Sequence, residues 1–201
     1  MRKFFNMKLQ TFNSAFIARS RTIVSIVTIL AICGTVIVLL GGVWDTTSHA
    51  LRVPETFWTI QHLTIYMGAS MITVSAVMCG LLLFKTTNKK MEKGIKIILL
   101  GATMQLVGGY ADYNFHEIYG IDGLVTPSHL TVESGLLLSS MGGLLTLSGF
   151  DYGHIRKMIP ISIVAVILSA AWIGFNLVLL LGAIVMCVPI YELFSSGCAV
   201  M

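Results

Sequence analysis

Residues 41–68 read GGVWDTTSHALRVPETFWTIQHLTIYMG, and residues 108–135 read GGYADYNFHEIYGIDGLVTPSHLTVESG. Aligned without a gap, the two stretches share nine residues, each separated by 67 positions. The shared pattern is GGxxDxxxH…TxxHLTxxxG, and its ionisable members are Asp45, His49 and His62 and then Asp112, His116 and His129. Self-similarity at one fixed offset is typical of an internal duplication, so the pattern predicts two related structural units.

The chain around these two stretches is strongly apolar. Of its 201 residues, 56% are hydrophobic and 11% are charged, and the mean hydropathy is +0.87. A run of about 20 apolar residues crosses a bilayer as a helix, and such runs lie at about 23–48, 57–84, 95–116 and 128–149. The sequence therefore predicts an all-α fold, a polytopic membrane helix bundle with two pseudo-repeated hairpins.

The number of spans depends on the last apolar stretch, Ile159 to Phe194, in which Glu192 is the one charged residue. This stretch is too long for one ordinary span and short for two. The segment Gly174-Phe175-Asn176 in its middle is typical of a tight turn. We therefore expect two short helices here and six spans in all, with five spans as the alternative.

We expect three parts along the chain: a basic cytoplasmic tail at 1–21, a single transmembrane domain at 22–194 and a tail at 195–201. The tail at the N-terminus mixes basic and apolar residues, so an amphipathic helix on the membrane surface and a flexible tail are both open. Within the transmembrane domain, the first repeat is at about 22–84, the second at about 95–149 and the C-terminal helices at 159–194.

Basic residues predict the orientation in the membrane. Twelve of the thirteen Lys and Arg residues lie before the first run, between the second and third, or after the fourth, and Arg52 is the exception. Cytoplasmic loops carry an excess of Lys and Arg, which predicts a plasma-membrane protein with a cytoplasmic N-terminus and with both Asp-His ends on the extracytoplasmic side. Topology thus accounts for the net charge of +4, and no nucleic-acid partner is implied. The first run is too long for a signal-peptide core, so we expect it to stay as an anchor.

The repeated residues have the composition of a metal site. Asp45 and His49 are four positions apart, which places both side chains on one face of a helix. His62 falls in the first turn of the next helix, and the short connection returns it to the depth of that pair. Each repeat can therefore gather one carboxylate and two imidazoles, which suits copper, iron or zinc. In the second repeat the same set is Asp112, His116 and His129.

The second repeat is richer in donors than the first. Glu133 follows His129 by four residues, whereas Tyr66 takes the matching place after His62. A carboxylate adds charge that holds a divalent cation, and a tyrosine near its ordinary pKa of about 10 adds little at neutral pH. We therefore expect Glu133 to be a fourth ligand and the second site to bind metal better. Further polar residues near these sites are Glu55, Asn114, Glu117 and Asp122.

Two other interpretations of the repeated residues stay open. Buried Asp and His side chains can hydrogen-bond to each other and simply hold a helix hairpin together. A haem b could use His62 and His129 as axial ligands, although this leaves both Asp-His pairs unexplained. The four cysteines show no C-x-x-C spacing and predict no cysteine-based metal site. His154, beside Arg156 in a cytoplasmic loop, is expected to be solvated.

The pattern D-x3-H-x12-H on consecutive membrane helices resembles a metal-binding membrane subunit of the copper membrane monooxygenases, the ammonia and particulate methane monooxygenases. That family has an Asp-His-His set and, further along, an Asn-His-His set at nearly the same spacing. The segment from Asp112 to His129 is similar to the Asp-His-His set, including a second Asp, Asp122, and the Thr-Pro before the last His. The segment 44–62 also resembles multi-pass membrane proteins that carry twin repeats of this type. The likeness covers about residues 40–140.

The resemblance implies metal ligands at Asp112, His116 and His129, with Asp45, His49 and His62 as the sister set. It also implies copper as the metal, other membrane subunits in a hetero-oligomeric complex, and oxidation of a small substrate such as ammonia or a hydrocarbon. Two departures matter: Asp112 stands where the family has Asn, and no further His set follows the second repeat. A relative or an accessory subunit is therefore the expectation beside the catalytic subunit, and so is a non-enzymatic metal-handling or structural role.

Overall fold

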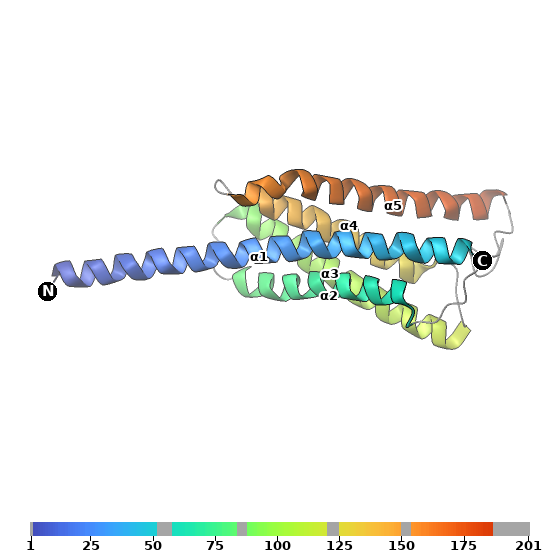
Figure 1. The fold of residues 1–201 in the computed structure, drawn as a ribbon, viewed down its shortest axis with the longest axis horizontal. Helices are drawn as coiled ribbons and strands as arrows, with labels where there is room; N and C mark the ends of the chain where they lie inside the picture. The colour runs from blue at the N-terminus through green and yellow to red at the C-terminus, as the bar shows by residue number, and fades with distance from the viewer. Residues whose placement is uncertain (1, 52–57, 84–87, 120–124, 150–153, 187–201) are drawn as a thin grey trace.

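The computed structural model describes residues 2–51, 58–83, 88–119, 125–149 and 154–186. It contains five α-helices and a short 3-10 helix, η1, within these ranges, and no β-strand occurs there (Figure 1). The elements are α1 (Arg2–Ala50), α2 (Ile60–Leu83), α3 (Lys89–Tyr119), α4 (Pro127–Ser148), η1 (His154–Met158) and α5 (Ile159–Met186). The all-α bundle expected from the apolar runs is confirmed.

Each of the five helices contains a stretch long and apolar enough to cross a membrane. The stretches are Thr22–Ser48, Ile60–Leu81, Lys89–Phe115, Pro127–Ser148 and Arg156–Leu181. They are 22 to 27 residues long, which at 1.5 Å per residue exceeds the hydrocarbon thickness of about 30 Å. The first four agree with the spans expected from hydropathy. The protein is therefore an integral-membrane type of bundle whose outer surfaces suit contact with lipid.

The turn expected at Gly174-Phe175-Asn176 is wrong, because α5 runs through it as one helix from Ile159 to Met186. The amide of Asn176 explains why no break is needed. Its Nδ2 lies 3.3 Å from the carbonyl oxygen of Trp172, one turn back in the same helix, and 2.5 Å from a carboxylate oxygen of α4. A polar side chain that is satisfied inside the bundle does not have to turn toward water. The described residues thus contain five spans, and 187–194 lie outside them.

Helix α1 begins at Arg2, so the expected basic tail, from residue 2 onward, belongs to the same helix as the first span. Its placement on the membrane surface stays a prediction. The described part of the core is formed by apolar side chains from all five helices, among them Val27, Ile32, Ile72, Ile98 and Leu147.

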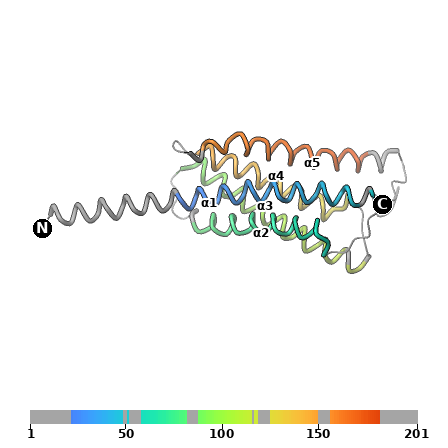
Figure 2. The backbone as a smooth tube through the Cα atoms, in the orientation of Figure 1, coloured from blue at the N-terminus to red at the C-terminus, as the bar shows by residue number. Residues whose placement is uncertain are grey.

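The helices pack as two hairpins, α1 with α2 and α3 with α4, with α5 along one side against α4 and α1 (Figures 1 and 2). Glycines allow close approach within each hairpin. A methyl group on Gly34 would lie 2.7 Å from the carbonyl oxygen of Gly68, and one on Gly101 would lie 2.5 Å from that of Gly135. Small residues at such crossings are typical of membrane helix pairs. The same spacing of 67 residues therefore relates the two crossings.

Hairpin connections place the repeated polar residues at one end of the bundle. The C-terminal ends of α1 and α3 and the N-terminal ends of α2 and α4 all lie at this end (Figure 1). Lys89 and Lys90, which open α3, lie at the opposite end, as do Arg156 and Lys157 before α5. The Asp-His end and the lysine-rich end are thus separated by the length of the spans.

Candidate metal centre

The first hairpin brings Asp45 and His62 into direct contact. Asp45 lies near the end of α1, and His62 lies in the first turn of α2. The His62 Nε2 and Asp45 Oδ1 atoms are 3.0 Å apart, and both side chains are largely buried. On the other side of the ring, the Thr59 Oγ1 atom lies 3.2 Å from His62 Nδ1. Both ring nitrogens of His62 therefore face an oxygen atom, which holds the ring in one orientation.

The second hairpin builds the same pair from Asp112 and His129. The His129 Nε2 and Asp112 Oδ1 atoms are 3.2 Å apart. Ser128 adds a hydrogen bond, because its hydroxyl donates to Asp112 Oδ1 at 2.8 Å. Thr126 caps α4 by accepting the backbone N–H of His129 at 3.2 Å. Pro127 follows as the first helical residue, a position that has no N–H to satisfy. The local sequence Thr-Pro-Ser-His therefore both starts α4 and positions the imidazole.

The equivalence of the two hairpins extends to backbone contacts beside these pairs. A methyl group on Gly41 would meet the side chain of Ile65 at 2.7 Å, and one on Gly108 would meet Val132 at 2.8 Å. Ile65 and Val132 are again 67 positions apart. Contacts that recur at the sequence offset show that the two hairpins cross in the same register. Their origin by duplication stays a prediction.

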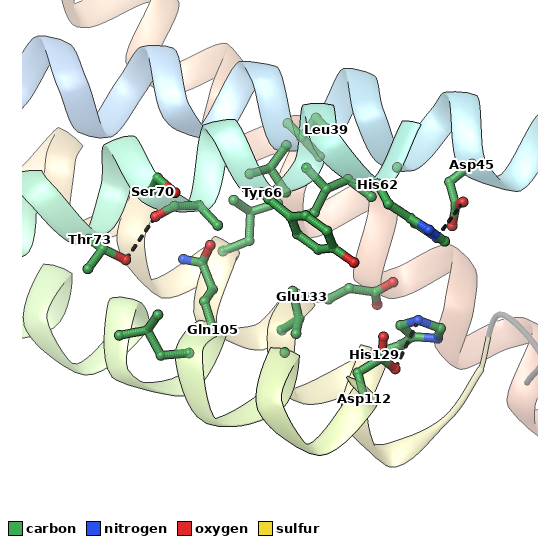
Figure 3. A pocket seen from close by; sticks show the side chains of 18 of the residues that line it. Leu39, Asp45, His62, Tyr66, Ser70, Thr73, Gln105, Asp112, His129 and Glu133 are labelled. Carbon is green, nitrogen blue, oxygen red and sulfur yellow. Dashed lines mark hydrogen bonds and ion pairs between the residues drawn. The ribbon is translucent and has the colours of Figure 1, made fainter. Parts of the chain in front are cut away.

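Both Asp-His pairs face one cavity of about 560 Å³ that lies between the hairpins (Figure 3). Figure 3 shows Tyr66 from α2 and Glu133 from α4 projecting into the same space. Gln105 of α3 and Trp172 of α5 complete its polar and aromatic lining. The two repeats therefore contribute to a single shared space.

Glu133, the expected fourth ligand, lines this cavity and is buried. Its Oε1 atom accepts a hydrogen bond from Asn176 Nδ2 at 2.5 Å. This contact ties the second hairpin to α5, because Asn176 is fully buried on that helix. Tyr66, at the matching place in the first hairpin, instead stacks on His62 with ring centroids 6.3 Å apart.

The third member of each expected triad lies in the helix that carries the Asp. His49 belongs to α1 and His116 to α3, but their side chains lie outside the described part of the structure. Among the described side chains, no three His, Cys, Asp or Glu residues gather closely enough to hold a metal ion. The complete triads therefore stay a prediction. What the described residues do provide is a carboxylate and an imidazole in contact in each hairpin.

The polar residues expected around the second site have different positions. The Asn114 side chain donates to the carbonyl oxygen of Tyr110 in its own helix at 2.6 Å, and Glu117 is exposed. Neither of these two residues is among those that line the cavity. Glu55 and Asp122 lie outside the described residues.

Sequence reasoning missed Gln105, Trp172 and Asn176 as members of this site. Gln105 and Asn176 are buried amides in apolar helices, and a polar side chain within a membrane segment is itself a signal of function. The repeat could not show them, because the position matching Gln105 in the first repeat is Val38 and α5 lies outside the repeats.

The donor set fits a transition metal in its chemistry. Imidazole nitrogen suits copper, iron and zinc, and carboxylate oxygen is a common companion ligand. A carboxylate in contact with a histidine also orients the ring and raises its basicity when the other nitrogen binds metal. Comparison with protein-family models, with curated proteins and with solved structures found no match to this chain.

Proposed function

We propose that this protein is a metal-binding integral membrane subunit of a copper monooxygenase-type complex. The observation that carries the proposal is the pair of Asp-His contacts, at 3.0 and 3.2 Å, that face one cavity from equivalent places in two hairpins. Two carboxylate-imidazole pairs in one membrane cavity are costly unless they serve a purpose. The expected ligands are Asp112, His116, His129 and Glu133 in the second hairpin and Asp45, His49 and His62 in the first.

Residues of the chain would have three roles in this function. The carboxylates of Asp45 and Asp112 would orient the imidazoles and bind metal. The apolar wall, including Leu39 and Leu136, would exclude water from the centre. Copper, when bound, would supply the activation of dioxygen for oxidation of a small substrate such as ammonia or a hydrocarbon.

The proposal includes an orientation. The lysine-rich end, with Lys89 and Lys90, would face the cytoplasm of the cell that carries the protein in its plasma membrane. The Asp-His end would then lie toward the extracytoplasmic side, close to the partner subunits of the complex. A cysteine placed at position 89 should resist an impermeant thiol reagent added from outside, and labelling there would reverse the orientation.

The test is the metal content of the protein purified from its own membrane together with its partner subunits. We expect copper in the wild-type complex and its loss in His129→Ala and Asp112→Asn, since even changes around a ligand weaken binding about 10–100-fold. Glu117→Gln is the matched control, because Glu117 is an exposed acid on α3 outside the cavity. Unchanged metal stoichiometry in both ligand variants would refute the proposal.

The second candidate is a non-enzymatic structural role, favoured by the direct contact between the two members of each pair. An Asp-His contact between consecutive helices fastens the hairpin without any metal. In that case His129→Ala lowers the melting temperature of the protein by the same amount with and without a chelator. If metal binds at the pair, the chelator lowers the melting temperature of the wild type and has no further effect on His129→Ala.

A further inference from the structure

The shared cavity is larger than a metal ion needs. Its volume of about 560 Å³ falls within the range of about 300–1,000 Å³ that is typical of pockets for organic ligands. All five helices contribute to it, and most of its lining is apolar. The apolar lining residues include Val38, Leu39, Ile65, Ala69, Val132 and Leu136. A molecule with a hydrocarbon portion would therefore be accommodated there.

Charges in the cavity favour a cation. Asp45, Asp112 and Glu133 supply three carboxyl groups, and His62 and His129 supply two imidazoles. No Lys or Arg occurs among the described residues that line it. Ionised carboxylates would therefore outnumber the imidazoles even if both rings were protonated. An anionic head group would be repelled, and a cationic one would be attracted.

Aromatic rings add a second feature that fits a cation. Trp58, Tyr66, Tyr110 and Trp172 all line the cavity. The face of an aromatic ring attracts organic cations, and quaternary ammonium groups are recognised by clusters of such rings. Aromatic rings beside carboxylates thus match an alkylammonium head better than a neutral or acidic one.

The cavity opens sideways between α2 and α3. Three of its lining residues are at the same time more than half exposed: Val74 at 51%, Leu106 at 55% and Tyr110 at 72%. They belong to the stretches Ile60–Leu81 and Lys89–Phe115, which are apolar enough to cross a membrane. The opening would therefore face lipid, and a ligand that dissolves in the bilayer could enter without crossing water.

We propose that this cavity binds a lipid-soluble organic cation, an alkylamine or an alkyl quaternary ammonium compound. The cationic head lies among Asp45, Asp112, Glu133 and the aromatic rings, and the alkyl chain lies along the apolar wall toward the opening. This inference concerns an organic ligand and does not rest on metal binding.

The test compares three probes with one chain length: octylamine, octanol and octanoate. The full-length protein is stripped of metal with a chelator and placed in phosphatidylcholine nanodiscs. Trp44→Phe serves as the background, because Trp44 does not line the cavity and its removal leaves Trp58 and Trp172 as reporters. We expect saturable fluorescence changes with octylamine, about tenfold weaker binding of octanol, and no saturable binding of octanoate.

Two variants locate the binding in the cavity. Glu133→Gln keeps the shape and removes a charge, so octylamine should bind about tenfold more weakly while octanol is unaffected. Glu117→Gln, which removes an exposed acid of α3 outside the cavity, should bind octylamine normally. If Glu133→Gln does not fold, Leu106→Trp tests the opening instead, because its exposed position tolerates a larger ring that obstructs entry.

Equal affinity for all three probes would overturn the proposal and leave an apolar pocket without charge preference. Normal octylamine binding by both Glu133→Gln and Leu106→Trp would overturn it as well. Because metal is absent from every sample, a failure here does not bear on the metal content of the native complex. A complex without metal likewise leaves the octylamine result unchanged.

Discussion

Hairpin α1–α2 and hairpin α3–α4 share their backbone crossings but differ in the polar side chains between their helices. Gly34 meets Gly68 in the first as Gly101 meets Gly135 in the second. Beside these crossings, the first hairpin has Val38 and Ile72 where the second has Gln105 and Ser139. The Gln105 amide donates to the Ser139 hydroxyl at 3.1 Å in the buried interior. An apolar contact in one hairpin is therefore a hydrogen bond in the other.

A second pair of matching positions differs in the opposite direction. In the first hairpin the Ser75 hydroxyl donates to the carbonyl oxygen of Val27 at 2.9 Å. The second hairpin has Gly142 and Gly94 at these places, and a methyl group on Gly142 would lie 2.7 Å from the Gly94 carbonyl oxygen. Direct backbone approach thus replaces a side-chain link. The path of the helices is common to both hairpins, and each stabilises it with different residues.

At the Asp-His end, the second hairpin has additional partners. Ser128 donates to Asp112, and Glu133 is held by Asn176 of α5. The first hairpin has Gln61 and Tyr66 at the places of Ser128 and Glu133. The difference teaches that one frame can hold two sites of unequal polarity, and it makes the second pair the better candidate for a metal.

The largest effect is expected where the two hairpins are most alike. Gly101→Ala and Gly34→Ala each place a methyl group within 2.7 Å of a facing carbonyl oxygen. Backbone atoms cannot rotate away, so the helices must separate, and we expect each change to lower the free energy of unfolding by about 3 kcal/mol or more. Unfolding in mixed detergent micelles measures this loss.

Gly109→Ala is the control for both glycine variants, because nothing lies within 4 Å of a methyl group there. Alanine is favoured over glycine inside a helix by about 1 kcal/mol, so this variant should be as stable as wild type or more so. A wild-type unfolding midpoint in Gly101→Ala combined with a large loss in Gly34→Ala would show that the two crossings are not equivalent.

An intermediate effect should separate the two metal sites. We expect His116→Ala to reduce the metal content and turnover of the complex more than His49→Ala, because Glu133 offers a carboxylate where the first hairpin has Tyr66. A lost ligand should weaken metal binding at its site by about 10-fold or more. Elemental analysis and turnover of the two purified complexes measure the difference. Equal losses would mean equivalent sites, and a larger loss in His49→Ala would reverse the ranking.

The smallest effect concerns the extra hydrogen bond of the second pair. Ser128→Ala removes the donor to Asp112 Oδ1, and a hydrogen bond of this kind contributes about 1 kcal/mol, or more when it goes to a charged group. The melting temperature should fall by a few degrees, and His129 should become easier to alkylate as its partner loosens. Thr131→Ala is the control, because that hydroxyl donates only to the carbonyl oxygen of Pro127 in its own helix. If both variants melt alike, the hydrogen bond from Ser128 does not support the pair.

Much of the fold follows from the sequence alone. The first four spans are set by the length of apolar runs, because a bilayer requires about 20 such residues and nothing but a helix satisfies their backbone there. The pairing of Asp45 with His62 and of Asp112 with His129 follows from the short connections, since consecutive helices joined in this way must lie side by side. Offset and spacing therefore located both pairs before any packing was known.

Only the tertiary structure decided the fate of α5 and the convergence of the two pairs. The choice between a turn and a continuous helix at Gly174 depends on Asn176, whose partner Glu133 is 43 positions away on α4. Composition and periodicity carry no information about which helices become neighbours across such distances. For the same reason, the shared cavity and its contributions from Gln105 and Trp172 emerge only when the two hairpins and α5 pack against one another.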